Sequence, residues 1–307
     1  MHTTIEAPSL APQNTAVPRR PGLRSALLRT RAVLQWRLLL WWAILLLLPA
    51  IVATLPFWQM LAANLDHSVH AARLAERLDM LAIADLVTSM RERGDAGAGL
   101  ANGGLVAVAL TLLLSPLLSG MTIAAVRAPQ RLRCIPLLAA GAQEYGRLLR
   151  MLAWAVVPLG IAGAVGGMAS GAAGRVAERA ILQGDAEQAT RLALVATVVL
   201  LALAHASLDA GRAILGNEPR RRSAVLAWWA GTRLLLRRPL AVLGVYMIVT
   251  GIGLAVAALL ALARLHVPAL GAAGTVGAVV LAELAVLALG VMRAARLAGM
   301  MELARRE

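Results

Sequence analysis

The sequence contains no lysine, and all thirty of its basic residues are arginine. A P-loop needs a lysine at the phosphates and a Schiff-base enzyme needs a lysine amine, so both chemistries are excluded. Cysteine occurs once, at Cys134, which excludes a disulfide framework and a cysteine-based metal cluster. Aspartate and glutamate are also scarce, with sixteen residues, and the formal net charge is +14.

Apolar residues make up 60% of the 307 residues. A soluble domain of this size cannot cover so much apolar surface, so the bilayer is the expected solvent. A strongly basic chain can bind nucleic acid, but here the arginines flank apolar runs and do not line one helix. We therefore expect an all-α, polytopic membrane protein that has no nucleic-acid partner.

Six apolar segments are each long enough to cross roughly 30 Å of hydrocarbon at about 1.5 Å per residue. They run approximately over residues 38–60, 100–126, 151–170, 192–214, 240–263 and 269–291. Residues 1–23 are rich in proline and small polar residues, which predicts a disordered tail. Residues 24–307 are expected to form one six-helix transmembrane domain.

Two further segments have amphipathic character. Arginines recur among leucine and valine between Arg24 and Arg37, which predicts a lead-in helix at the lipid headgroups. Apolar residues recur at spacings near three to five within residues 61–98, with acids and arginines between them. This second pattern predicts an amphipathic helical region on the outer surface.

The arginines are distributed unevenly between the two sides of the predicted membrane domain. The N-terminal tail, the 127–150 loop, the 212–238 loop and the C-terminal tail hold 22 of the 30 arginines. By the positive-inside rule these segments, and both termini, lie in the cytoplasm. The bias toward Ala, Leu, Gly and Arg is typical of a GC-rich genome, and the predicted location is the bacterial cytoplasmic membrane.

The two cytoplasmic loops resemble each other at an offset of 90 residues. The matching positions are Pro129 and Pro219, Arg131 and Arg221, Ala140–Gly141 and Ala230–Gly231, and Arg147 and Arg237. Each predicted unit is a span, a Pro/Arg turn, an amphipathic helix (Ile135–Arg150 or Ser223–Arg238) and a second span. Such units are related by an axis along the membrane normal, and the chain ends form a third, split unit. Chance similarity in an Ala/Leu/Arg-rich background is the alternative.

Three polar residues within apolar segments are candidates for an ion or proton site. An ionised Glu283 in the sixth segment costs about 2.5 kcal/mol or more, so it is expected to face the bundle, pair with a cation or stay protonated. His205 and Asp209 share one face of the fourth segment, where they can relay protons or hold a cation. The structural alternatives are a neutral Glu283 hydrogen-bonded to another helix, and an Asp209 paired with Arg212 or Arg127.

The densest basic patch comprises Arg220, Arg221, Arg222, Arg237 and Arg238. At the inner leaflet each arginine adds roughly 1 kcal/mol of attraction to anionic lipid. A second role for these residues is to keep the loop on the cytoplasmic side of the membrane, and a third is to bind an acidic cytoplasmic partner.

Two other patterns have structural explanations. Glycines recur every four residues at Gly163, Gly167 and Gly171, which predicts close helix packing, within the chain or in a homo-oligomer. Asp66, His67 and His70 cluster after the first span. They lack a zinc-binding pattern such as His-Glu-x-x-His, so we expect a solvated face and no metal. The sequence offers no catalytic constellation, and no cofactor is expected.

The segment Ala139-Ala140-Gly141-Ala142-Gln143-Glu144-Tyr145-Gly146, with the later Val156-Val157-Pro158, resembles the coupling loop of ABC-transporter permeases. The glutamate before the alanine pair is missing, and Gly146 lies two residues late. In architecture, the six spans with cytoplasmic amphipathic helices look like bacterial six-helix families related to the membrane domain of glycerophosphodiester phosphodiesterase. That likeness implies a fold and brings no catalytic residue.

Two functions follow as expectations. The first is a non-enzymatic inner-membrane scaffold or accessory component, which acts through helix packing and its basic cytoplasmic face. Its partners would be anionic lipids, a second copy or other membrane subunits. The second is a transporter or permease subunit with a polar site around Glu283. A membrane enzyme is the least supported alternative.

Overall fold

The computed structural model describes residues 22–65, 88, 95–179, 183–267 and 271–306, which form helices and short connections without a strand. The long helices are α2 (Trp36–Leu65), α5 (Asp95–Arg127), α6 (Cys134–Arg179), α7 (Gln183–Asn217), α9 (Pro239–His266) and α10 (Gly271–Leu303). The short ones are α1 (Leu23–Arg29), α8 (Ala224–Arg237) and the 3-10 helices η1 (Thr30–Val33) and η2 (Ala304–Arg306). Six of the described helices are long and apolar enough to cross a membrane. The chain is therefore an all-α, polytopic membrane protein, as predicted.

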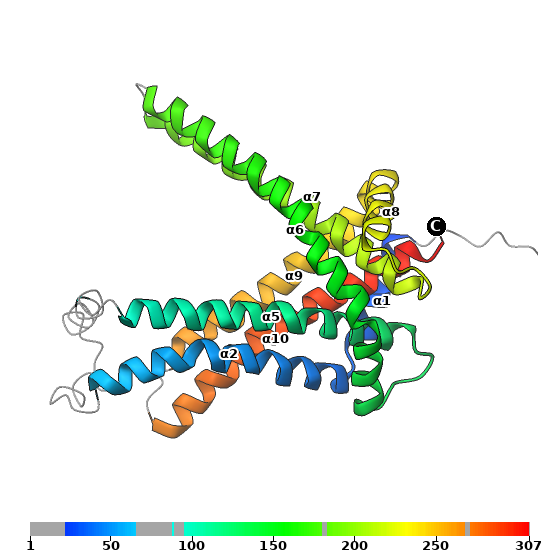
Figure 1. The fold of residues 1–307 in the computed structure, drawn as a ribbon, viewed down its shortest axis with the longest axis horizontal. Coiled ribbons are helices and arrows are strands. Elements are labelled where there is room, and N and C mark those ends of the chain that lie inside the picture. Colours follow the sequence, from blue (N-terminus) through cyan, green and yellow to red (C-terminus); the bar gives the residue numbers. More distant parts are fainter. Residues whose placement is uncertain (1–21, 66–87, 89–94, 180–182, 268–270, 307) are drawn as a thin grey trace, which may run out of the picture.

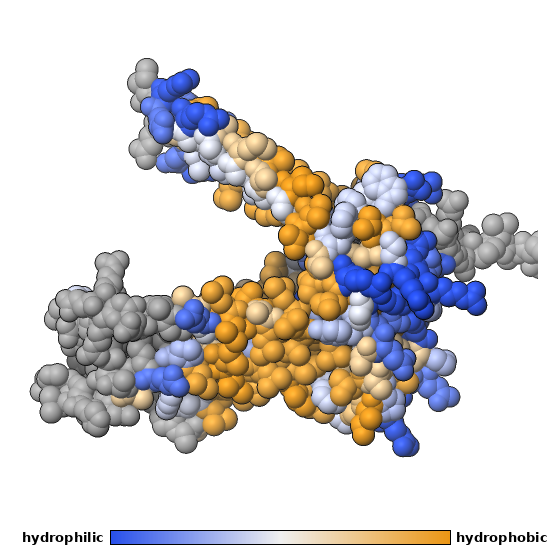
Figure 2. Space-filling model, viewed as in Figure 1, coloured by the Kyte–Doolittle hydropathy of each residue, from blue (hydrophilic) through white to orange (hydrophobic). Residues whose placement is uncertain are grey.

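The long helices pack α2 with α5, α6 with α7, and α9 with α10, and the first part of α6 also packs against α5 (Figure 1). The α6–α7 pair projects away from the other two pairs. Figure 2 shows that the space between this pair and the rest of the molecule stays open when side chains are drawn. α1 packs against α10 and α9, so the first described helix lies beside the last long helix. The lead-in segment is thus helical, although it divides into α1 and η1.

Each predicted span coincides with one of the six helices, but α6 differs from the prediction. The surface helix Ile135–Arg150 and the span after it form one continuous helix of 46 residues, about 69 Å long. No proline interrupts α6 between Pro136 and Pro158. In the second unit Pro239 ends α8, because its ring cannot fit against the preceding turn, and begins α9 as a first-turn residue.

The predicted repeat is visible in the boundaries of the helices. α5 ends at Arg127 and α7 at Asn217, 90 residues later; α6 begins at Cys134 and α8 at Ala224, again 90 residues later. Both connections are therefore the same length and follow the same kind of helix end. This correspondence favours the repeat over chance similarity.

A close crossing of two helices repeats at the same offset. A Cβ added to Gly141 of α6 would stand 3.1 Å from both the Leu117 carbonyl oxygen and the Met121 nitrogen of α5. A Cβ added to Gly231 of α8 would lie 2.8 Å from the Gly211 Cα of α7. Only glycine permits backbones to approach this closely. The contact of α10 with α1 is looser, because a Cβ added to Gly299 would lie 3.4 Å, an ordinary van der Waals distance, from the carbonyl oxygen of Ala26.

The arginine-rich segments gather at one end of the molecule, which we call the basic end. It comprises residues 22–37, 127–150, 209–238 and 293–306. In Figure 2 hydrophilic side chains cluster there, beside α8, and an apolar band covers the helices next to it. The separation of charge from apolar surface along the helices is the pattern expected of a protein that spans a bilayer.

The prediction that Gly163, Gly167 and Gly171 pack helices within the chain is wrong. All three are exposed, and a Cβ added to Gly163 or Gly167 would meet no heavy atom within 4 Å. The face of α6 that packs on α7 instead contains Gly166, whose added Cβ would lie 3.0 Å from the Cβ of Thr197. Helical periodicity explains the error, because a face offset by one residue from a glycine row points about 100° away. A contact with a second chain stays a prediction.

Several predictions fall on residues that lie outside the described ranges. They concern most of the tail 1–23, most of the outer amphipathic region 61–98, and the cluster of Asp66, His67 and His70.

Candidate functional site

Polar side chains are buried where α5, α7 and α10 converge near the basic end. Within the described ranges, the buried polar or charged residues are Ser115, Ser119 and Thr122 of α5, Ser207, Asp209 and Arg212 of α7, and Arg296 of α10. The surrounding core consists of apolar side chains. Charged residues in such surroundings are costly unless they are paired, so their partners define the site.

Asp209 is the centre of this group. Its Oδ1 accepts a hydrogen bond from Arg212 Nη1 at 2.6 Å, and its Oδ2 lies 3.2 Å from Arg296 Nε. The side chains of Asp209, Arg212 and Arg296 are only 4%, 9% and 5% exposed. His205, one helical turn before Asp209, places Nδ1 3.7 Å from Oδ2. One carboxylate thus joins α7 to α10.

Arg296 extends the contacts to α9. Its guanidinium lies 4.8 Å from the ring centroid of Tyr246, a cation–π geometry, and its Nη1 donates to Thr250 Oγ1 at 3.1 Å. The Tyr246 hydroxyl and His205 Nδ1 are hydrogen-bonded at 3.2 Å. Helices α7, α9 and α10 are therefore held together by polar contacts inside an otherwise apolar interface.

Arg293 links the same region to α5. Its Nη2 donates to the Ser115 hydroxyl at 2.7 Å. We call Asp209 with Arg212, Arg293 and Arg296 the Asp209 cluster, which has three positive charges and one negative charge. Because arginine does not lose its proton in proteins, the positive excess is permanent. It repels a cation and suits an anion.

The sequence predicted part of this arrangement. His205 and Asp209 do lie together. Asp209 pairs with Arg212, one of the two partners that the structural alternative predicted for it. Arg293, Arg296 and Tyr246 were missed as partners. The two arginines lie where α10 continues twelve residues beyond the predicted end of the sixth span at residue 291, and Tyr246 meets His205 and Arg296 only through the packing of α9. The Arg-Ala-Ala-Arg spacing of Arg293 and Arg296 was the available signal, since residues three apart share one helix face.

Glu283 lies apart from the Asp209 cluster. It precedes Arg293 by ten residues on α10, about 15 Å along the helix axis. Its Oε1 is buried and has no hydrogen-bond partner in the described part of the chain. The structure does not bring Glu283 to His205 or Asp209, and its role as an ion or proton site stays a prediction.

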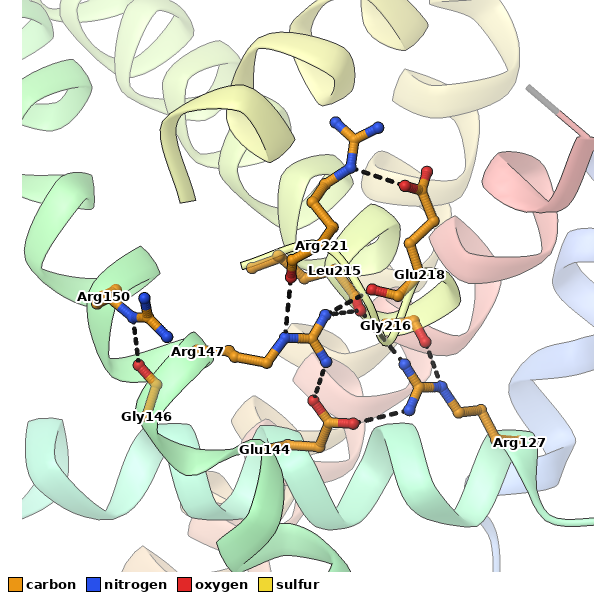
Figure 3. A network of polar contacts seen from close by, with 9 residues as sticks. All are labelled: Arg127, Glu144, Gly146, Arg147, Arg150, Leu215, Gly216, Glu218 and Arg221. Atoms are coloured by element: carbon orange, nitrogen blue, oxygen red, sulfur yellow. Dashed lines mark hydrogen bonds and ion pairs between the residues drawn. The ribbon is translucent and has the colours of Figure 1, made fainter. Parts of the chain in front are cut away.

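A second polar network lies nearer the basic end, around Glu144 of α6 (Figure 3). Arg127 Nη1 donates to Glu144 Oε1 at 2.7 Å, and Arg147 Nη1 donates to Oε2 at 2.5 Å. Arg127 also donates from Nε to the Gly216 carbonyl and from Nη2 to the Leu215 carbonyl. The carboxylate thus orients two arginines toward the end of α7.

The carbonyls that receive these arginines explain why the network forms. The last carbonyls of an α-helix have no partner within the helix and carry partial negative charge. Arg147 donates to three carbonyls here, those of Leu215 at 2.8 Å, Glu218 at 2.7 Å and Arg221 at 3.1 Å. The end of α7 and its following turn are thereby fixed to α5 and α6.

A third set of contacts involves α1, the start of α2 and the end of α10. Arg29 Nη2 of α1 donates to the Val126 carbonyl of α5 at 3.1 Å, and Arg29 Nε lies 3.9 Å from Glu302 Oε2 of α10. Arg305 Nη1 lies 3.2 Å from the same oxygen. Arg37 at the start of α2 donates to the Leu132 carbonyl at 3.1 Å.

The predicted basic patch divides into two places. Arg220 and Arg222 are exposed in the turn between α7 and α8, where Arg221 Nε pairs with Glu218 Oε2 at 2.7 Å. Arg237 is the exposed last residue of α8, and the half-buried Arg238 forms the corner between α8 and α9.

Comparisons with models of protein families, with curated proteins and with solved structures find no match to this chain.

Proposed function

We propose that this protein is a non-enzymatic scaffold or accessory component of the membrane that acts through its basic end, where it holds anionic lipid. The supporting observation is a charge imbalance at this end, which contains twenty arginines and four acids. Each acid is already engaged by at least one arginine; the four are Glu144, Asp209, Glu218 and Glu302. No carboxylate at the described basic end is therefore left to neutralise the exposed arginines, which favours external anions.

The basic end is proposed to face the cytoplasm of a bacterial cell, because arginine-rich short loops are retained inside. A reporter that is active only in the periplasm should be silent when fused after Arg222 and active when fused after Arg179. Activity at Arg222 with silence at Arg179 would invert the proposed orientation.

The lipid preference is tested with purified protein in mixed micelles, where retained phosphatidylglycerol and phosphatidylcholine are counted by native mass spectrometry. We expect phosphatidylglycerol to be favoured. The triple variant Arg220→Gln/Arg222→Gln/Arg237→Gln should weaken its retention by about 5-fold per arginine, roughly 100-fold in all. The control is Arg175→Gln/Arg179→Gln, which removes two exposed arginines from the opposite end of α6 and is compared per arginine removed. Equal losses in both variants would contradict a role for the basic end.

Transport is the second candidate, favoured by the buried and unpartnered Oε1 of Glu283. A protonatable carboxylate within a span is a common element of proton pathways. Proton flux into proteoliposomes that contain a pH-sensitive dye should then be abolished by Glu283→Gln, with normal insertion of the protein. Flux that is absent in the wild type, or equal in the variant, eliminates this candidate. An ABC-type permease role also requires a gene for an ATPase next to this one.

A further inference from the structure

We propose that Ser115 of α5, His205 of α7 and Arg293 of α10 form a binding site for a phosphate group. We call these three residues the axial site. The inference goes beyond the proposed function, which depends on exposed arginines, because this site lies inside the helix bundle. The phosphate group belongs either to an inorganic ion or to a lipid headgroup, two sources that binding measurements separate.

The residues of the axial site occupy equivalent positions in the three repeat units. Ser115 and His205 are separated by the repeat offset of 90 residues. α10 aligns with α7 at an offset of 88, which matches Arg293 to His205. Identical residues follow in both helices at this offset: Ala206 and Ala294, Ala210 and Ala298, and Gly211 and Gly299. Equivalent residues of units that surround a common axis lie at one level, so the three helices bring these side chains together.

The axial site lies where the buried part of the bundle ends. Uninterrupted runs of buried residues extend from this level toward the basic end, over 118–123 in α5, 206–216 in α7 and 296–301 in α10. On the opposite side α5 exposes Leu112 and Leu113, and α7 exposes Leu203. The open space between the α6–α7 pair and the rest of the molecule lies on this side as well (Figure 2). The axial site is thus the first polar level on the open side of the packed core.

Arg293 supplies the positive charge of the axial site. Within the described ranges it forms no ion pair, and its one hydrogen bond runs from Nη2 to the Ser115 hydroxyl at 2.7 Å. Asp209 is engaged elsewhere, because its carboxylate pairs with Arg212 at 2.6 Å and with Arg296 at 3.2 Å. A half-buried charge without a counter-ion is costly. An anion bound beside Arg293 would remove this cost.

The donors of the axial site match a ligand with several oxygens. A guanidinium has five N–H donors in a planar fork, and Arg293 uses one of them in the described part of the chain. His205 Nδ1 is hydrogen-bonded to the Tyr246 hydroxyl. When Nδ1 accepts this bond, the proton of the neutral ring lies on Nε2 and is available to a ligand, since the His205 side chain is 32% exposed. A phosphate presents several oxygens to these donors, whereas a halide presents one atom.

Equilibrium dialysis with radiolabelled inorganic phosphate tests the axial site, with the full-length protein in maltoside micelles. We expect one saturable site per chain. Arg293→Gln should lower the affinity at least about 10-fold, because it removes a hydrogen bond between charged groups. The matched control is Arg222→Gln, which removes one exposed arginine at the basic end and should leave the affinity within about 2-fold. Equal losses in the two variants would place the phosphate on the exposed surface and overturn the site.

Unfolding midpoints of the same samples show whether the variants are folded. Arg293→Gln removes a charge that has no counter-ion, so without phosphate its midpoint should equal or exceed that of the wild type. Added phosphate should raise the midpoint of the wild type only. Arg293→Lys keeps the charge and loses the fork, and should bind phosphate with intermediate affinity. If Arg293→Gln does not fold, this second variant decides, and a wild-type affinity in it would overturn the site.

Phosphatidic acid separates the two sources of the phosphate group. Its retention is counted by native mass spectrometry in the wild type and in Arg293→Gln. Retention that depends on Arg293 assigns the site to a lipid headgroup, and dialysis that detects Arg293-dependent binding of inorganic phosphate alone assigns it to the free ion. The proposal fails if neither ligand binds in an Arg293-dependent way, or if equimolar chloride displaces the bound phosphate.

Discussion

Replacing Asp209 by asparagine is expected to lower the free energy of unfolding by about 3–5 kcal/mol, the usual effect of removing one partner from a buried ion pair. Asparagine keeps the shape of the side chain and removes its charge. Arg212 and Arg296, now 2.6 and 3.2 Å from the carboxylate, would face an amide. Three guanidinium groups would then lie close together in a core that excludes water, with no anion among them.

The measurement is reversible unfolding in detergent micelles, followed by circular dichroism. Glu187→Gln is the control, because Glu187 and Arg191 form an exposed pair at 3.0 Å on the same helix. Exposed pairs at this spacing contribute about 0.3–0.5 kcal/mol, so the control should unfold nearly as the wild type does. A loss below about 1 kcal/mol for Asp209→Asn would contradict the buried cluster.

The membrane class and the six spans were predictable because both depend on composition along the chain. Burial in lipid requires long apolar runs, and a run over residues 240–263 appears as α9 without any knowledge of its neighbours. The repeat was also visible in the sequence, since its proline, arginine and glycine residues are required by local features, the turn and the helix crossing of each unit. Gly141 and Gly231 are the clearest case, because these two glycines are separated by the repeat offset and each lies where two helix backbones cross closely.

The polar partners were harder to predict, because they depend on which helices touch. Asp209 has Arg212 on its own helix, and this pair follows from spacing alone. Its second partner, Arg296, is 87 residues away, and only the packing of α7 against α10 brings the two together. Glu144 is similar: its pair with Arg147 is local, whereas its pair with Arg127 requires the turn between α5 and α6. The spacing of residues in the sequence does not predict such contacts between different helices.

Replacing Gly231 by alanine is expected to destabilise the protein by about 3 kcal/mol, at the upper end of the usual effect of overpacking. The new methyl group would lie 2.8 Å from both the Ala210 carbonyl carbon and the Gly211 Cα. Both atoms are backbone, so no side chain can rotate away. α8 would have to move off α7, and the hydrogen bond between Trp228 Nε1 and Ser207 Oγ would be strained with it.

Gly146→Ala is the matched control, since Gly146 lies in the helical part of α6 and an added Cβ would meet no heavy atom within 4 Å. It should stabilise the protein by about 0.5–1 kcal/mol through helix propensity. Unfolding midpoints of the two variants should therefore move in opposite directions, and Trp228 fluorescence should change only in Gly231→Ala.

Gly141→Ala tests whether the two repeated helix crossings respond alike to an added methyl group. Its Cβ would also press on backbone, 3.1 Å from the Leu117 oxygen and the Met121 nitrogen. A smaller loss than in Gly231→Ala is expected there, since the backbone atoms are farther away, whereas a gain in stability would show that the two crossings are unrelated.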